Sequence, residues 1–323
     1  MTTYNVLHLN FAIASMSGIP AGSQTCITSL RQNIRRIASS SSIGMVKVLT
    51  DKEGLKHTHL TNFAINLAET IKFVQQIPQA NGQMQVCLPP LIENFKNLGL
   101  PWFNQDQAIN PQFFQESISR FQFNVQTSGF DEANEAWLTV SKRAAQDFDK
   151  CFKTLSKNTR GFDLYELLIS TPLNPDLMPS LMVSTQTKFN QTLDKEILQL
   201  ICKNEINQIC AVLCKSEVNI NQQYVSRFII AVQCEYINDY QDIADSSFVD
   251  EIRTLIQSYN ASQVYFQPCK LNGFLRNNRF MKESPTLKAQ IKLLKTYLIG
   301  TDTLIRIHPQ QPSCRILYTK FKD

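Results

Sequence analysis

The sequence predicts an α/β fold, a mainly parallel sheet flanked by helices, with a long helix in the middle of the chain. Segments typical of strands and of helices alternate in both halves. The first 50 residues follow the strand, loop, helix, strand order of a βαβ unit, which builds parallel sheets. An apolar fraction of 43% and a charged fraction of 18% are typical of globular proteins. An α+β arrangement is the alternative, because the last two strand-like segments resemble an antiparallel pair.

The opening βαβ unit starts with residues 4–12, a short apolar run typical of a buried strand. A stripe of Ile and Leu at spacings of three and four predicts a helix over residues 25–38. A second strand over 44–50 closes the unit. The rest of the N-terminal half is expected to contain a helix over 60–77, a strand over 84–88, an irregular connection over 99–113 and a long helix over 131–156.

The C-terminal half repeats the alternation. Ser247 is placed to cap one helix, Ser284 and Pro285 precede another, and Gly300 ends it. The segment 224–237 fits a strand or a helix. The other expected elements are strands over 164–170, 181–185, 206–214, 263–267, 303–308 and 315–321, and helices over 191–203, 247–259 and 285–298. We expect an N-terminal half, residues 1–158, and a C-terminal half, residues 159–323, or one continuous domain.

Charge is unevenly distributed along the chain. Residues 1–50 contain four basic residues and no acid, and residues 263–323 contain eleven basic residues and three acids. The middle of the chain is therefore acidic, although the whole chain has a net charge of only +5. This pattern predicts either an anionic partner for the basic ends, such as a nucleotide, a nucleotide-linked donor or RNA, or internal pairing with the acidic middle.

The first candidate site is the loop before the helix at residues 25–38. In a parallel sheet a ligand binds at the carboxyl ends of strands, where a helix N-terminus offers N–H groups to phosphate. The glycines allow close approach, the hydroxyls can donate hydrogen bonds and the arginines can neutralise phosphate. An ordinary capped turn is the alternative. The expected phosphate- or nucleotide-binding residues are Ser17, Gly18, Gly22, Ser23, Thr25, Arg31 and Arg35.

The second candidate is a cysteine nucleophile. Cys26 falls in the first turn of the same predicted helix, where a thiolate is favoured. Its base would be His8 on the neighbouring strand or His308 at the end of a late strand. A hydrolase or acyltransferase is one interpretation, and a buried thiol is the other.

The third candidate is the basic C-terminal region. Four cations surround Phe274 and Phe280, a mixture suited to phosphate contact and base stacking, and three lysines form a stripe on the following helix. A solvated face and a membrane-surface helix are the alternatives. The expected nucleic-acid-binding residues are Lys270, Arg276, Arg279, Lys282, Lys288, Lys292 and Lys295.

Three functions remain open. The βαβ opening favours a phosphate- or nucleotide-binding transferase that uses a nucleotide-linked donor, with a cofactor that the sequence does not name. The alternatives are a non-enzymatic viral or effector-type protein that binds RNA, and a Cys26 hydrolase. No metal site is expected, and Cys210 and Cys214 are expected to be core thiols. The nine scattered cysteines, together with the lack of a signal peptide or a long apolar run, predict a cytoplasmic protein, or one in a host cytosol.

Overall fold

The chain forms two compact units, which are described separately. The computed structural model describes residues 33–38, 44–68, 87, 89–96, 110–127, 129–171, 191–200, 209–218, 224–234, 247–257, 263–271, 273–303, 305–308 and 310–321. Of these, unit 1 contains Cys87 and everything from Val140 onward, and unit 2 contains the rest. The boundary lies at residue 140, inside the long helix, whereas the sequence predicts a division at residue 158.

Unit 1 is built on a six-stranded sheet in which every pair of neighbouring strands is antiparallel. The order is β6-β3-β5-β4-β8, and β7 also pairs with β3. The prediction of a mainly parallel sheet is therefore wrong, and the α+β alternative fits. The strands are β3 (Gly161–Thr171), β4 (Ile209–Val218), β5 (Tyr224–Gln233), β6 (Gln263–Pro268), β7 (Arg279–Met281) and β8 (Cys314–Thr319).

The connectivity explains why alternating helices and strands gave the wrong sheet. A helix at residues 191–200 lies between β3 and β4, and α9 (Ser247–Gln257) lies between β5 and β6. Each of these strand pairs points the same way, but a third strand is inserted between its members. This is the β-α-β-β-α-β, or split βαβ, arrangement of ferredoxin-like domains. The short link between β4 and β5 forces an antiparallel hairpin, because a parallel crossover needs a dozen or more residues.

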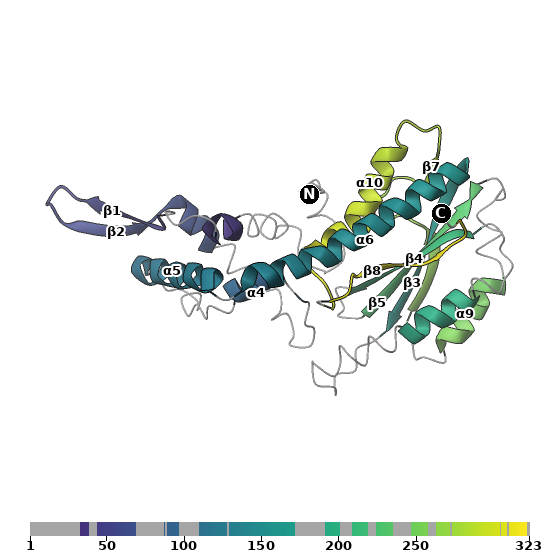
Figure 1. Cartoon of the computed structure of the whole chain (residues 1–323), viewed down its shortest axis with the longest axis horizontal. Coiled ribbons are helices and arrows are strands. Elements are labelled where there is room, and N and C mark those ends of the chain that lie inside the picture. The colour runs from purple at the N-terminus through teal and green to yellow at the C-terminus, as the bar shows by residue number, and fades with distance from the viewer. Residues whose placement is uncertain are drawn as a thin grey trace. The chain divides into compact units, whose positions relative to one another are not determined.

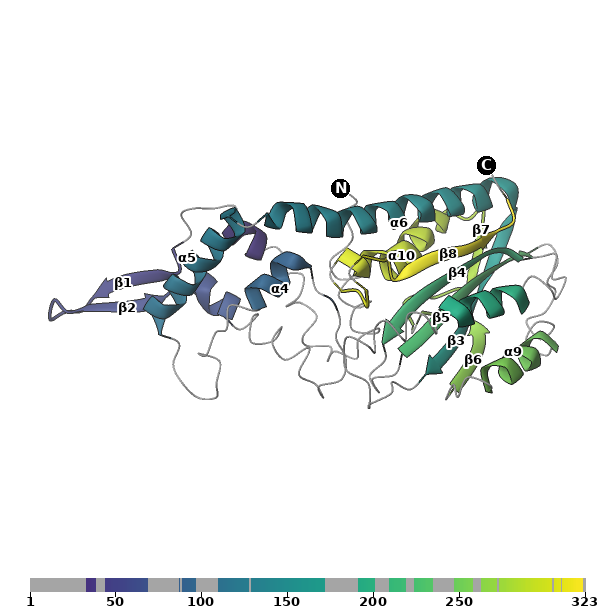
Figure 2. The same cartoon turned by 60° about the horizontal axis from the view of Figure 1, so that its bottom comes forward.

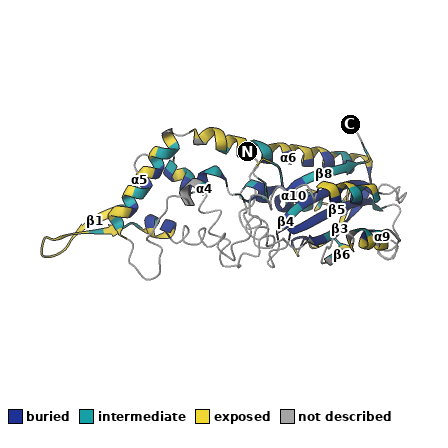
Figure 3. Ribbon diagram, turned by 90° about the horizontal axis from the view of Figure 1, so that it is seen from below, coloured by how far each residue is buried: buried dark blue, intermediate teal, exposed yellow. Residues whose placement is uncertain are grey.

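Two helical layers cover the two faces of this sheet. Figures 1 and 2 show α6 (Phe130–Asn158) and α10 (Leu287–Leu298) on one side and α9 on the other. Phe148, Phe152 and Leu294 belong to the core on the first side, and Leu193 and Ile252 belong to the core on the second. The central strands β4 and β5 are buried, whereas α6 exposes its outward side (Figure 3). The sheet is thus enclosed between two helical layers.

Several predicted elements of unit 1 are confirmed. The long helix over 131–156 corresponds to α6, and the helices and strand expected near 247–259, 263–267 and 285–298 correspond to α9, β6 and α10. The expected pairing of the last two strands is wrong. Arg306 instead bridges to Cys87, and β8 pairs with β4. Between α10 and β8 lies the short 3-10 helix η4 (Gly300–Thr303).

Unit 2 contains a hairpin and short helices. Strands β1 (Val46–Thr50) and β2 (Lys56–Leu60) pair antiparallel, so the strand expected over 44–50 is present but does not pair as the end of a parallel βαβ unit would. α4 (Pro90–Lys96) and α5 (Pro111–Thr127) follow. The sequence analysis missed α5, which Asn110 caps by accepting hydrogen bonds from the backbone N–H groups of Gln112 and Phe113. None of the described helices is both long and apolar enough to span a bilayer.

Candidate functional site: a basic helical face and an adjoining groove

The predicted N-terminal site lies almost entirely outside the described residues. That holds for His8, Ser17, Gly18, Gly22, Ser23, Thr25, Cys26 and Arg31. Arg35 is half-buried in the helix at residues 33–38. His308 is half-buried in unit 1, and its Nδ1 accepts a hydrogen bond from the backbone N–H of Gln310 at 3.3 Å. The nucleotide and cysteine-nucleophile sites stay predictions, and the parallel sheet from which the nucleotide site was argued is absent from the described strands.

The structure separates the predicted C-terminal cations into two groups. Arg279 forms a bidentate ion pair with Asp163, with both N–O distances 2.9 Å, and Lys295 is buried against Asp149, with its Nζ 2.5 Å from the carboxylate. Their charges are therefore largely neutralised. The other five predicted cations are exposed. Lys288 and Lys292 lie in α10, and the segment that carries the rest packs Leu271 and Phe274 into the core on the α10 side: Lys270, Arg276 and Lys282.

The long helix α6 adds cations that the sequence analysis did not single out. Its C-terminal part lies beside α10, and Lys282 connects the two regions, since its Nζ donates to the carbonyl of Lys157 at 3.4 Å. The basic residues recur at helical spacing along the exposed side of α6, which is the sequence signal that was available. The exposed cations at residues 140–160 are Lys142, Arg143, Lys150, Lys153, Lys157 and Arg160.

Together these residues give the α6 and α10 side of unit 1 a strong excess of exposed positive charge, and we call them the basic face. It consists of the exposed cations of residues 140–160 and 270–298, eleven besides the paired Arg279. The exposed acids in the same segments are Asp147, Asp149 and Glu283. By contrast, the described exposed charges of the helix at 191–200 and of α9, on the other side of the sheet, are Lys195, Asp250 and Arg253, and Asp194 is buried against Arg315. Among the described residues, the strong excess of positive charge therefore lies on the α6 and α10 side of unit 1.

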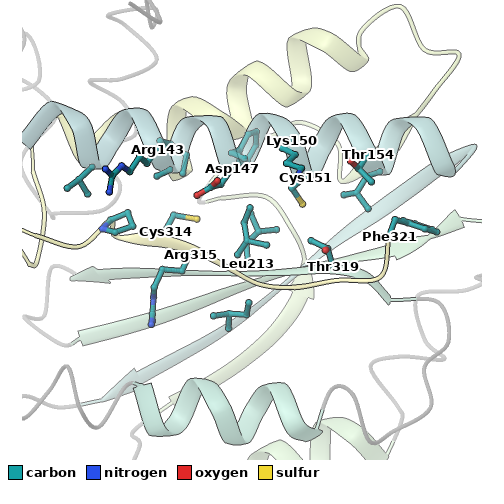
Figure 4. A pocket seen from close by; sticks show the side chains of 18 of the residues that line it. Arg143, Asp147, Lys150, Cys151, Thr154, Leu213, Cys314, Arg315, Thr319 and Phe321 are labelled. Atoms are coloured by element: carbon teal, nitrogen blue, oxygen red, sulfur yellow. The ribbon is translucent and has the colours of Figure 1, made fainter. Parts of the chain in front are cut away.

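A groove of about 840 Å³ runs between α6 and β8, at the edge of the basic face. Figure 4 shows Asp147, Cys151 and Thr154 along α6, Cys314, Thr319 and Phe321 along the β8 side, and Leu213 between them. Arg315 points away from α6, and its guanidinium pairs with Asp194 on the far side of the sheet. The groove therefore combines an apolar interior with a rim that contains Arg143 and Lys150.

The two thiols in the groove are not prepared for nucleophilic chemistry. Burial, with a smaller contribution from the nearby Cys210, raises the pKa of Cys151 to about 12. Burial also raises the pKa of Cys314 to about 12, although Lys215 opposes the shift. Both side chains are thiols at neutral pH, and a thiol is a poor nucleophile.

An ionic network is buried between the sheet and α10. Arg227 pairs with Glu217, its Nε 3.1 Å from each carboxylate oxygen, and with Glu166. Lys215 donates hydrogen bonds to the carbonyls of Tyr297 and Leu298, at 2.9 and 2.7 Å. It therefore provides hydrogen-bond partners for carbonyl groups at the C-terminal end of α10. All of these side chains are inaccessible to solvent. The network therefore positions α10 and does not form a binding site.

Metal ligation has no support in the described part of the chain, where no group of three or more His, Cys, Asp and Glu side chains converges. Cys210 and Cys214 lie in β4 and are fully buried.

No protein-family model matches the sequence, and no curated protein or solved structure matches it. A function must therefore be inferred from the surface of unit 1 itself.

Proposed function

We propose that unit 1 is a non-enzymatic RNA-binding module that holds the phosphate backbone on its basic face. The observation that carries the proposal is the eleven exposed cations of α6, α10 and the segments next to them, against three exposed acids. Lysine and arginine at such density release counterions from a nucleic acid when they bind its phosphates, which makes binding strong at low salt. The helices across the sheet have few exposed charges, so the uneven charge orients the protein on its partner.

The basic face suits the backbone better than the bases. Phe274 and Phe280, which the sequence suggested as stacking platforms, are buried, and Phe280 stacks on Phe162 inside the core with ring centroids 5.2 Å apart. The sheet surface is covered by α6 and α10 and is also closed to bases. The exposed cations on this face therefore contact phosphates, and these contacts by themselves do not distinguish one base from another.

Membrane binding fits the same face poorly. An interfacial helix needs an apolar side that enters the lipid. The apolar side of α10 includes Leu294 and Leu298, which are fully buried in the core of unit 1. A cationic surface without such a side favours a solvated polyanion.

The proposed setting is a reducing cytoplasm, either of the cell that makes the protein or of a host. All seven cysteines in the described part of the chain are free thiols, which supports this setting. A nucleotide-linked transferase remains a prediction for residues outside the described part.

The test reverses charge on each layer in turn. Lys288→Glu with Lys292→Glu changes the basic face, and Lys195→Glu with Arg253→Glu makes the same change on the α9 side of the sheet. Fluorescence anisotropy with single-stranded and duplex RNA, over a salt series, is expected to show that the first pair weakens binding by about tenfold or more and lowers the salt slope by about two. The second pair is expected to have little effect. Equal loss from both pairs, or no RNA binding by the unmodified protein, would refute the proposal.

A further inference from the structure

We propose that the groove between α6 and β8 holds unpaired guanine bases of the RNA whose phosphates lie on the basic face. This inference rests on the proposed function and adds a basis for selecting single-stranded over duplex RNA. In a duplex the base edges are paired and stacked, so only a single strand can place a base in a pocket.

The dimensions and interior of the groove suit bases. A volume of about 840 Å³ lies within the range of small-molecule sites and exceeds the size of one base. Val140 on α6 and Ile316 on β8 line the groove, and both are half-buried, so they supply apolar surface from its two walls. Phe321, a half-buried aromatic residue at one end of the groove, offers a ring for stacking (Figure 4).

The charges along the α6 wall separate a base-binding part from phosphate-binding parts. Asp147 is exposed and lines the groove, with Arg143 four residues before it and Lys150 three residues after it, so the three share one side of the helix. A carboxylate repels phosphate but accepts hydrogen bonds from N–H groups on a base edge. The two cations are placed to receive the phosphates on either side of that base.

Guanine is the base whose edge matches a carboxylate best. Its N1–H and N2 amino group are adjacent donors, so one carboxylate can accept from both. Uracil offers a single N–H donor between two carbonyls, and adenine and cytosine place an acceptor beside their amino group. A bidentate contact of this kind discriminates between bases by roughly tenfold or more.

The first experiment removes one acid at a time. Asp147→Ala removes the carboxylate from the groove, and Glu283→Ala removes an exposed carboxylate from the basic face outside it. The probes are uridine-rich RNA oligonucleotides of about twelve nucleotides that contain a few guanosines, the same oligonucleotides with inosine for guanosine, and a duplex of equal length. Inosine lacks the N2 amino group and therefore reports on that contact.

The unmodified protein is expected to prefer guanosine over inosine by about tenfold, and Asp147→Ala is expected to abolish that preference. Glu283→Ala should tighten binding slightly to all three probes, because it removes repulsion alone. If Asp147→Ala also tightens binding to every probe, the carboxylate only repels phosphate and the proposal is overturned. That result would leave the groove to another occupant, such as an extended peptide.

A second variant tests the space itself. Thr154→Trp fills the groove from the α6 wall without changing charge, and it is expected to weaken single-strand binding by about tenfold while leaving duplex binding and its salt dependence unchanged. An unchanged ratio of single-strand to duplex affinity would overturn the proposal. The basic face would still stand in that case, because Lys288→Glu with Lys292→Glu would continue to weaken both forms of RNA.

Discussion

The two helical layers of unit 1 cover the same sheet in different ways. On the α9 side, the strands meet the helices through apolar side chains such as Phe228, Ile230 and Ile252. On the α10 side, an apolar core is joined by the buried Arg227 and Lys215 networks. The outer surfaces also differ, since one layer carries the basic face and the described exposed charges of the other are only Lys195, Asp250 and Arg253.

This difference separates the properties of a helix that are imposed by packing from those that packing leaves free. Both layers bury an apolar side, because the sheet must be covered on both faces. Their outward sides make few tertiary contacts, so their charge is not set by folding. A strong excess of one sign on such a surface is therefore evidence about a partner.

The largest expected effect comes from breaking the ionic network on the α10 side. Arg227→Ala leaves the carboxylates of Glu166 and Glu217 buried without their cation, and we expect a loss of about 3–5 kcal/mol in the free energy of unfolding. Urea unfolding followed by circular dichroism measures this loss. The apolar counterpart, Phe228→Ala on the α9 side, is expected to cost a similar amount by creating a cavity.

A combined variant distinguishes breaking the network from replacing it. Arg227→Met with Glu166→Leu and Glu217→Leu removes all three charges and keeps apolar volume, so it is expected to be less destabilising than Arg227→Ala alone. A triple variant as unstable as the sum of its single changes would contradict this account.

A smaller effect concerns the pH dependence of stability. Burial raises the pKa of Asp302 above its ordinary value of 3.8, and Lys215 and Arg306 only partly oppose the shift. Because the folded state holds this proton more tightly than the unfolded state, the contribution of Asp302 is fully present below pH 3.8 and is lost as pH rises through the folded pKa. Relative to Asp302→Asn, the unmodified protein should thus lose stability over this range, as urea unfolding at a series of pH values will measure. A constant difference between the two proteins would argue against a raised pKa.

A third prediction separates paired from exposed lysines on α10. Lys295→Met removes an ion pair with Asp149, whose carboxylate is 59% exposed, and should cost about 0–1 kcal/mol. Its effect on RNA affinity should be about twofold or less, because Asp149 already neutralises Lys295. Lys292→Met, one turn earlier and exposed, should weaken RNA binding more. Anisotropy titrations of both variants make the comparison. A larger loss of RNA affinity from Lys295→Met than from Lys292→Met would contradict the assignment of RNA binding to the exposed cations of the basic face.

The smallest expected signal is the reactivity of the groove thiols. With pKa values of about 12, Cys151 and Cys314 have a thiolate fraction of roughly 10⁻⁴ at pH 8. Iodoacetamide should therefore label them slowly in the folded protein and rapidly in urea, as read by peptide mass spectrometry. Cys214, buried in the core on the α9 side, should also be labelled slowly in the folded protein. Rapid labelling of the groove thiols alone would show that the groove activates them.

Residue patterns predicted much of the secondary structure of unit 1. The apolar stripe of α6 and the cap position at Ser247 are local features, so helices at both places followed from sequence alone. Helix α5 was missed because the Asn110 and Pro111 start signal lay in a stretch that lacked clear periodicity. The candidate site was predicted in part: five of the seven predicted C-terminal cations belong to the basic face. The α6 cations were available in the sequence as a second helical stripe but were not recognised.

What the sequence determined by itself was local: which segments are helical or extended, which sides are apolar, and that the C-terminal region carries excess positive charge. Only the tertiary structure decided that the sheet is antiparallel, because strand order depends on which strands pair and not on how helices and strands alternate. It likewise decided that Arg279 and Lys295 are neutralised by Asp163 and Asp149, and that α6 and α10 combine their cations on one surface. The two ion pairs join residues more than 100 positions apart, which no local pattern encodes.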